Sequence, residues 1–309
     1  MAVPQRIAPH GGIRGLIARY PLVSFFTLAF ALSWIAWTPY VLGMNGLGLE
    51  PEIDFPKIMG TTQLLGVLPG AYLGPILAAF LVTAAAEGRP GLRRWAGRLL
   101  KWNVNWRWYV GAILGVPAAM ILTGVALSGG DIHLPGAAVF VALLPGLAFQ
   151  MVTTGLAEEP GWRDFALPYL QPKFGPLRGT LILGPLWGLW HLPLFFSEWG
   201  QWPDVTVWTI VKFIATTTLF SIVMTWVFNR SGQSLPIAML VHTSVNNTIS
   251  IAWADLFPSA TTDDVAWVFL LASALAAAVV LIATRGRLGY RGDEIVTTAP
   301  PVTAPPVRS

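Results

Sequence analysis

The sequence predicts an all-α fold, a polytopic membrane bundle of eight transmembrane helices with both termini in the cytoplasm. Its composition gives the first two indications. Of the 309 residues, 54% are hydrophobic and 11% are charged, and the mean hydropathy is +0.61; a soluble chain of this length would be much less apolar. The third indication is that apolar residues gather in runs of about 20, the length that crosses the hydrocarbon core of a bilayer.

The first apolar run covers residues 20–44 and follows a short basic segment that contains Arg6, Arg14 and Arg19. This run is too long for the core of a signal peptide and lacks a small-residue cleavage site. We therefore expect an uncleaved first transmembrane helix, preceded by a cytoplasmic segment over residues 1–19.

Seven further apolar runs predict the remaining spans. They lie near residues 63–86, 108–128, 137–157, 179–197, 207–228, 234–253 and 265–284. Several contain Gly or Pro, which membrane helices tolerate when their neighbours satisfy the freed backbone groups. We expect one membrane domain over residues 20–285, followed by a Pro-rich, disordered cytoplasmic tail over residues 286–309.

Lys and Arg alternate between rich and poor in successive connecting segments, as the positive-inside rule requires when every span has been found. The segments that we place inside contain Arg6, Arg14, Arg19, Arg89, Arg93, Arg94, Arg98, Lys101, Arg107, Arg163, Lys173, Arg178, Arg230, Arg285, Arg287, Arg291 and Arg308. The segments that we place outside contain Lys57, with Glu50, Glu52, Asp54, Asp131, Glu198, Asp204, Asp255, Asp263 and Asp264. Both termini are therefore predicted to be cytoplasmic.

The segment between the second and third spans, residues 91–109, mixes Arg and Lys with Trp and Leu. That composition is typical of an amphipathic helix on an anionic membrane surface. Ordinary positive-inside anchoring explains the same charges without such a helix and is the simpler interpretation, and both interpretations stay open.

Two features of the composition narrow the function. The chain has no cysteine, which excludes disulfides, thiol nucleophiles and thiolate metal sites. The net charge is +4, but the basic residues lie in short segments beside apolar spans instead of on one patch, so we expect the lipid bilayer as a partner and no nucleic acid. No sequence feature indicates an oligomeric state.

A first polar cluster, Glu158, Glu159 and Arg163, stands at the end of the fourth apolar run. Ionisable groups at membrane depth are costly and are by default functional. Residues four apart share a face of a helix, so Glu159 and Arg163 can pair while Glu158 points elsewhere as a free carboxylate, a candidate base towards water. The alternative is that all three merely end the span and are solvated.

Two further polar pairs lie inside later spans. Trp187 and His191 are four residues apart, and so are His242 and Asn246. Each pair can form a hydrogen bond between helices that simply holds the bundle together. If the three clusters meet, however, a carboxylate, two imidazoles and an amide can hold one water and one carbonyl group, as peptide hydrolysis requires.

The three clusters match known motifs in order. Glu158 to Arg163 reads EExxxR, Trp187 to His191 reads FxxxH with Trp in place of Phe, and His242 to Asn246 reads HxxxN. The chain thereby resembles the CAAX protease and bacteriocin-processing (CPBP, or Abi) family, the group of type II CAAX prenyl endopeptidases.

The resemblance implies an intramembrane glutamic endopeptidase. In such an enzyme Glu158 and His191 would activate a water, and His242 and Asn246 would polarise the scissile carbonyl and stabilise the oxyanion. Glu159 and Arg163, with Trp187 in the place of Phe, would hold these groups in position. We expect no cofactor, a multi-pass protein of the cell membrane, and an active site towards the cytoplasmic half.

Other functions remain open. A zinc-dependent membrane protease would use Glu158, His191 and His242 as metal ligands. A non-catalytic bacteriocin-immunity or scaffold protein would bind a peptide in the membrane cavity, and a transporter is a further alternative, although no internal repeat supports it. The expected substrate of an enzyme is a membrane peptide or lipidated protein, either prenylated and CAAX-type or bacteriocin-like.

Overall fold

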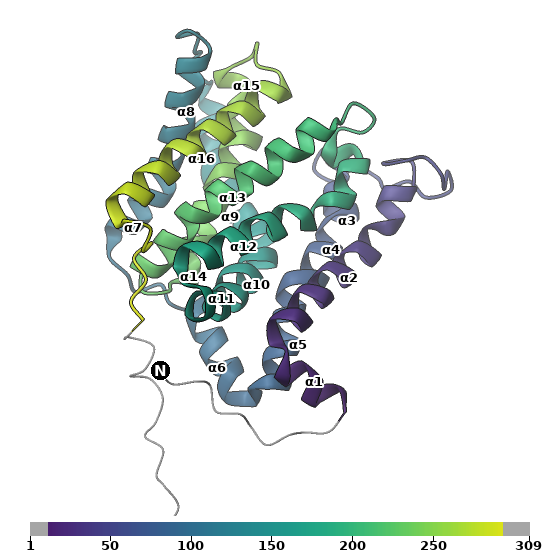
Figure 1. The fold of residues 1–309 in the computed structure, drawn as a ribbon. Helices are drawn as coiled ribbons and strands as arrows, with labels where there is room; N and C mark the ends of the chain where they lie inside the picture. The colour runs from purple at the N-terminus through teal and green to yellow at the C-terminus, as the bar shows by residue number, and fades with distance from the viewer. Residues whose placement is uncertain (1–11, 293–309) are drawn as a thin grey trace, which may run out of the picture.

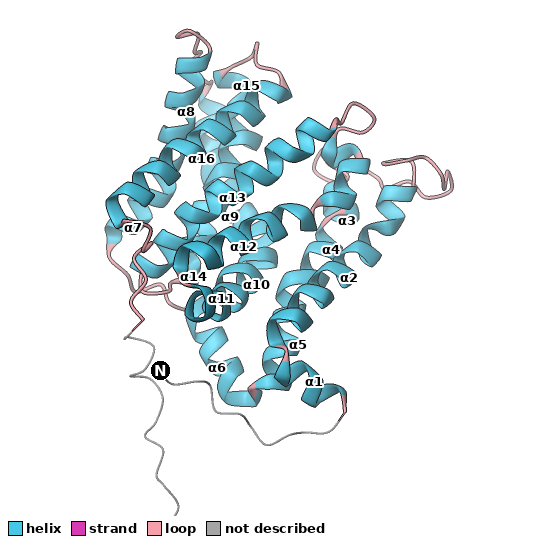
Figure 2. Ribbon diagram, viewed as in Figure 1, coloured by secondary structure: helices cyan, strands magenta, loops and turns pink. Residues whose placement is uncertain are grey.

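The computed structural model describes residues 12–292 of the chain. Over this range the secondary structure is helical, apart from one isolated bridge between Ile58 and Thr61, and no strand is present (Figures 1 and 2). The all-α prediction is therefore confirmed. The N-terminal residues 1–11 and most of the predicted tail, residues 293–309, lie outside the described residues.

Seven helical runs in the described part of the chain are long and apolar enough to cross a membrane. They are α2 (Pro21–Leu42); Gln63–Ala86, with α3 (Gln63–Gly66), α4 (Leu68–Ala71) and α5 (Leu77–Ala86); Trp106–Leu127, with α7 (Trp106–Val110) and α8 (Val116–Leu127); Ala137–Phe174, with α9 (Ala137–Gln150), α10 (Leu156–Gly161) and α11 (Leu167–Phe174); Pro176–Phe196, with α12 (Pro176–Trp190); α13 (Val207–Arg230); and α16 (Thr262–Thr284). The shorter helices are α1 (Ile13–Arg19), α6 (Gly88–Leu99), α14 (Leu235–Asn247) and α15 (Trp253–Leu256).

The predicted span at residues 234–253 is not among these seven, so the count of eight is not confirmed. Its residues nevertheless form α14, which continues through a π-helical segment (Thr248–Ala252) into α15. Twelve of the thirteen residues of α14 are buried, because the other helices surround it (Figure 1). A helix enclosed by protein can carry polar side chains such as His242 and Asn247 without meeting lipid, and its mean hydropathy falls accordingly.

The fourth span is longer than predicted. The sequence indicated residues 137–157, whereas the helical run continues to Phe174 through two π-helical segments, Met151–Gly155 and Trp162–Ala166. Such segments insert an extra residue into a helical turn and occur frequently at functional sites. The helix continues past Glu158 because this part of the run packs against the second span: a Cβ at Gly161 would lie 2.5 Å from Cβ of Pro75. Glycine permits that close approach.

Helix α12 is fixed by contacts with two neighbours. On one side Trp190 Nε1 donates a hydrogen bond of 2.8 Å to Ser33 Oγ of α2. On the other side α12 packs closely against α13, since a Cβ at Gly184 would lie 2.6 Å from the Cα of Thr218. The last turn of α12, which carries Trp187 and is followed directly by His191, is thereby held between α2 and α13.

Segment 91–109 begins inside α6, which contacts the fourth span. Trp95 Nε1 donates a hydrogen bond of 3.0 Å to the carbonyl oxygen of Pro160, and Arg98 forms an ion pair with Asp164. The arginines at positions 93 and 94 remain exposed, and Arg94 forms an ion pair with Glu87. Helix α6 thus supports the helical run that contains Glu158, in addition to presenting positive charge to its surroundings.

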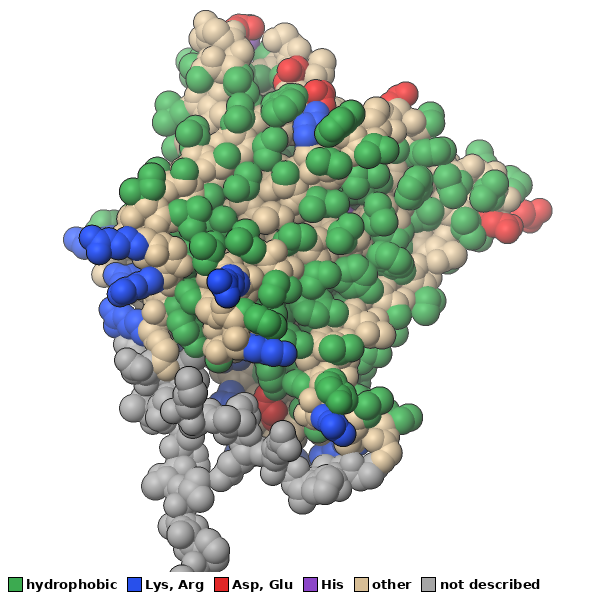
Figure 3. Space-filling view, viewed as in Figure 1, with side chains coloured by type: hydrophobic (Ala, Val, Ile, Leu, Met, Phe, Trp, Pro, Cys, Tyr) green, Lys and Arg blue, Asp and Glu red, His purple; other side chains and the backbone are tan. Residues whose placement is uncertain are grey.

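The surface separates charge by sign. Figure 3 shows hydrophobic side chains over the middle of the visible face, with most Lys and Arg towards one end and most Asp and Glu towards the other. This arrangement agrees with spans that alternate in direction, and the cytoplasmic location of the basic end remains a prediction from the positive-inside rule. Leu288 at that end, within the predicted tail, is fully buried and packs on the bundle against Ile222, Ala277 and Val280.

Candidate active site

The two glutamates of the first motif lie inside the protein. Glu158 is 6% exposed and Glu159 is 0% exposed, and Arg163 beside them is fully buried. The alternative that these residues end a span and are solvated is therefore excluded in this structure. Each charged group needs a partner at such a position, because an unpaired buried charge is strongly destabilising.

Glu159 has two such partners. Its Oε2 lies 3.4 Å from Nε of Arg163, one helical turn later, as the spacing indicated. Its Oε1 lies 2.8 Å from Nδ1 of His242 on α14. Arg163 in turn donates a hydrogen bond of 3.1 Å from Nη2 to Ser221 Oγ of α13. Glu159 therefore ties the first motif to the third, a contact that the sequence did not indicate.

Glu158 has a different environment. Its Oε2 accepts a hydrogen bond of 2.8 Å from the indole Nε1 of Trp187. Its Oε1 makes no hydrogen bond with any residue that the structure describes. One carboxylate oxygen is thus held while the other can accept a hydrogen bond from a small molecule such as water.

Trp187 contacts every charged or imidazole side chain of the motifs except Glu159. Besides its bond to Glu158, its carbonyl oxygen lies 3.0 Å from Nδ1 of His191. The guanidinium carbon of Arg163 stands 4.2 Å from the centre of the indole ring, at the distance of a cation–π contact. The imidazole of His242 lies edge-on to the same ring, with 5.1 Å between the ring centroids and an interplanar angle of 84°.

His191 stands directly after the last residue of α12 and is 7% exposed. A carbonyl oxygen can only accept a hydrogen bond, so the contact with Trp187 assigns the proton of the neutral imidazole to Nδ1 and leaves Nε2 as an acceptor. The ring stacks on Trp199, with the centroids 5.4 Å apart and the planes 15° apart, and Phe213 packs edge-on to it at 5.0 Å. No direct hydrogen bond joins His191 to Glu158 in the described structure.

Asn246 lies one turn after His242 on α14, and the two share a face of that helix. Its side chain is partly exposed and makes no hydrogen bond with the described residues. The next residue, Asn247, instead donates a hydrogen bond of 3.0 Å to the carbonyl oxygen of Leu143. Asn247 is therefore occupied in packing α14 against α9, whereas the amide of Asn246 is available to a ligand.

Sequence reasoning did not single out Asp164, which follows Arg163 directly. Its carboxylate is buried and pairs with Arg98 of α6, and Arg98 Nη2 also donates a hydrogen bond of 2.9 Å to the carbonyl oxygen of Asp164. The sequence could have pointed to Asp164, because it is a third acidic residue within the same apolar surroundings as Glu158 and Glu159. Ser221, the partner of Arg163, carried no such signal.

The zinc alternative requires Glu158, His191 and His242 to converge on one point. Within residues 12–292, no group of three or more His, Cys, Asp or Glu side chains is placed to hold a metal ion. The Nδ1 atoms of both histidines are hydrogen-bonded to protein groups, which leaves Nε2 of each ring as the nitrogen available to a ligand. In this arrangement, however, the described side chains do not converge on one point as a zinc site requires.

Comparison with known proteins agrees with the motifs. Residues 140–248 match the family described as type II CAAX prenyl endopeptidase Rce1-like, and this segment contains all seven motif residues. A curated relative, CAAX prenyl protease 2 of Methanococcus maripaludis, is 23% identical over 232 residues, which make up 72% of this chain and 81% of that protein.

Proposed function

Since both comparisons support the CAAX protease and bacteriocin-processing family for this chain, we propose that it is an intramembrane glutamic endopeptidase. The family that the motifs indicated is thereby confirmed, and with it a membrane protein related to the CAAX proteases. The single observation that carries the proposal is the buried Glu158, with one carboxylate oxygen held by Trp187 and the other free.

In the proposed reaction Glu158 acts as the general base. Oε1 accepts a proton from a water molecule while His191, through its unprotonated Nε2, orients the same water. The resulting hydroxide equivalent attacks the scissile carbonyl, and as the C–N bond breaks Glu158 passes the proton to the leaving amine. A carboxylate that is shielded from bulk water is a better base than an exposed one, which suits this role.

His242 and Asn246 stabilise the oxyanion. Glu159 accepts a hydrogen bond from Nδ1 of His242, and this contact turns Nε2 of the ring away from Glu159. With a proton on both ring nitrogens, His242 also donates from Nε2, and together with the free amide of Asn246, one turn along the same helix, it supplies two donors for the developing negative charge. The Glu159–Arg163 pair holds the imidazole in its orientation, in the way that carboxylates orient histidine ligands and bases.

The proposed substrate is a membrane-associated peptide or lipidated protein. The name of the relative refers to a prenyl protease, and prenylated CAAX-type peptides are therefore the first substrates to test, beside unmodified bacteriocin-like peptides. Glu158, Trp187 and His191 lie within helical runs that can span a membrane, and α14 is enclosed among these runs. This position supports a substrate that enters from the bilayer or from its surface.

The experiment is cleavage of quenched fluorescent peptides, prenylated and unmodified, by detergent-purified protein. Wild type is compared with Glu158→Gln, each with and without a metal chelator. Cleavage by the wild type that the substitution abolishes and the chelator leaves intact supports the glutamic mechanism. Loss of activity on chelation would indicate that a metal, and not Glu158 alone, activates the water. No cleavage of any peptide by well-folded wild type would favour the immunity or scaffold function.

A further inference from the structure

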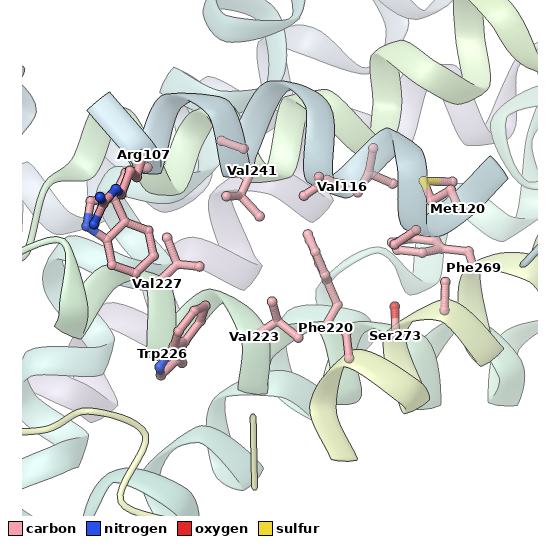
Figure 4. Close-up of a pocket in the computed structure, with 18 of the residues that line it drawn as sticks. Arg107, Val116, Met120, Phe220, Val223, Trp226, Val227, Val241, Phe269 and Ser273 are labelled. Atoms are coloured by element: carbon pink, nitrogen blue, oxygen red, sulfur yellow. The ribbon is translucent and has the colours of Figure 1, made fainter. Parts of the chain in front are cut away.

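An apolar groove of about 480 Å³ lies on the far side of α13 and α14 from Trp187. Its walls come from α7 and α8, from α13, from α14 and from α16 (Figure 4). Phe220 and Val223 project into it opposite Val116. Almost all of its lining is apolar, and the polar side chains along it are Asn105, Arg107 and Ser273.

The protein itself does not fill this groove. Gly111 and Gly115 line it, and a Cβ built on either glycine would meet no atom within 4 Å. The small side chains of Ala112 and Ala119 continue the same wall. In a bilayer such a space is occupied by a hydrocarbon chain, because water gains nothing from an apolar lining.

One end of the groove is basic. Figure 4 shows Arg107 and Trp226 together at that end, with Met120 and Ser273 at the other. The guanidinium of Arg107 stands over the ring of Trp106 at 5.9 Å, and it forms no ion pair within residues 12–292.

A second cavity of about 420 Å³ adjoins this end, since Trp226 lines both spaces. Its other walls include Arg230 at the end of α13, Arg287 and Arg291 after α16, and Tyr290. Within residues 12–292, no acidic side chain lines it, and neither Arg230 nor Arg287 forms an ion pair there. This basic recess therefore concentrates positive charge beside the open end of an apolar groove.

We propose that the groove and the basic recess together bind one anionic phospholipid of the bilayer. An acyl chain lies in the groove between α8, α13 and α16, and the phosphate lies in the recess against Arg230 and Arg287. Arginine is suited to a phosphate because its guanidinium presents donors in a planar fork. Basic pockets at the cytoplasmic ends of membrane helices bind anionic headgroups in this way.

The position of the site favours a phospholipid over the lipid chain of a peptide substrate. A prenyl chain would fill the groove as well as an acyl chain does, but the scissile bond of a prenylated peptide lies next to its lipid chain, and no motif residue lines the groove or the recess. The site is also separate from the proposed catalytic residues, and Phe220 stands between them: its ring lies 6.3 Å from that of Trp187 and 6.4 Å from that of His242. A bound acyl chain would therefore pack against Phe220, whose ring lies beside those of Trp187 and His242.

Thermal unfolding of the full-length protein in a neutral detergent, combined with native mass spectrometry, tests the proposal. The probes are dioleoyl phosphatidylglycerol, dioleoyl phosphatidylcholine, dihexanoyl phosphatidylglycerol, inorganic phosphate and a farnesylated peptide. We expect dioleoyl phosphatidylglycerol to raise the unfolding temperature and to remain bound, with a clearly smaller effect of each other probe. Equal effects of the two dioleoyl lipids, or preferential retention of the farnesylated peptide, would overturn the proposal, as would a full effect of phosphate alone.

Two sets of variants locate the site. Arg230→Gln and Arg287→Gln should each weaken binding of dioleoyl phosphatidylglycerol roughly fivefold, the effect of one basic residue near an anionic headgroup. The matched controls are Arg93→Gln and Arg178→Gln, each of which removes one charge from an exposed position elsewhere. Unchanged binding in the Arg230 and Arg287 variants, or equal loss in the controls, would refute the recess as the headgroup site.

The second set fills the groove. Gly115→Leu places a side chain in the open space of the groove wall, and Gly97→Leu on the exposed face of α6 introduces the same residue where a Cβ also meets no atom within 4 Å. We expect Gly115→Leu to reduce binding of the dioleoyl lipid at least fivefold while Gly97→Leu leaves it unchanged. Equal binding by both variants, each shown to unfold cooperatively, would exclude the groove as the acyl-chain site.

Discussion

The indole nitrogen of Trp187 donates a hydrogen bond of 2.8 Å to Oε2 of Glu158 and so joins the first motif to the second. The family motif has phenylalanine at this position, and phenylalanine has no donor. The substitution, which in the sequence looked like an exchange of one aromatic ring for another, therefore adds a polar contact to the proposed base. It also fixes which oxygen of Glu158 is free.

Glu158→Gln tests the base directly. The amide keeps the shape of the carboxylate but cannot accept a proton from water, so we expect hydrolysis to fall by a factor of about 10² to 10⁴ or more. The measurement is the initial rate of peptide cleavage, with thermal unfolding as the control for folding. A variant that retains most of the wild-type rate would rule out Glu158 as the base.

Trp187→Phe removes the donor and keeps an aromatic ring. Loss of a hydrogen bond to a charged group is worth about 1.5 kcal/mol, and we expect kcat/KM to fall roughly tenfold, mainly through kcat, because the bond orients the base. Trp253→Phe is the matched control, since Trp253 is buried but its Nε1 has no hydrogen-bond partner. Equal effects of the two substitutions would argue against an orienting role for Trp187.

Arg163→Ala should impair both stability and activity. It leaves the carboxylate of Glu159 buried with only His242 as a partner, and breaking a buried ion pair costs about 3–5 kcal/mol. Denaturant unfolding and cleavage assays of the same preparation measure the two effects. Arg93→Ala, at an exposed position, should change neither, whereas a fully active and normally stable Arg163 variant would contradict the proposed role of the pair.

Asp164→Asn should separate stability from catalysis. Asp164 pairs with Arg98 and so ties α6 to the fourth span, but it touches no motif residue other than its neighbour in the chain. We expect a loss of about 2 kcal/mol in the free energy of unfolding with kcat unchanged. Asp263→Asn, which breaks the exposed pair with Lys212, should cost much less because exposed ion pairs contribute little. A fall in kcat for Asp164→Asn would instead connect this pair to the reaction.

The orientation in the membrane can be tested with single cysteines, since the chain contains none. A cysteine at exposed position 97 on α6 should be shielded in intact cells from a membrane-impermeant maleimide, whereas one at exposed position 52 should react with it. The reason is the excess of Lys and Arg in the segments around α6. Labelling of position 97 alone would reverse the predicted topology and place the basic recess outside.

The sequence by itself determined the features that depend on local geometry and composition. Long apolar runs predicted membrane-spanning helices because few other structures bury so many apolar residues in succession. The pairing of Glu159 with Arg163 was predictable because residues one helical turn apart face each other whatever surrounds the helix. The motif residues were also found from their order and spacing, since each motif spans only about one turn.

The tertiary structure alone decided which residues of different helices touch. The contacts of His242 with Glu159 and of Trp187 with Glu158 depend on how α10, α12 and α14 pack, and no spacing along the chain encodes that packing. The enclosure of α14 allowed a helix with polar side chains to lie within the bundle. The length of the fourth span depended on its packing against the second span. The basic recess likewise brings Arg230 together with Arg287, because the ends of α13 and α16 meet only after folding.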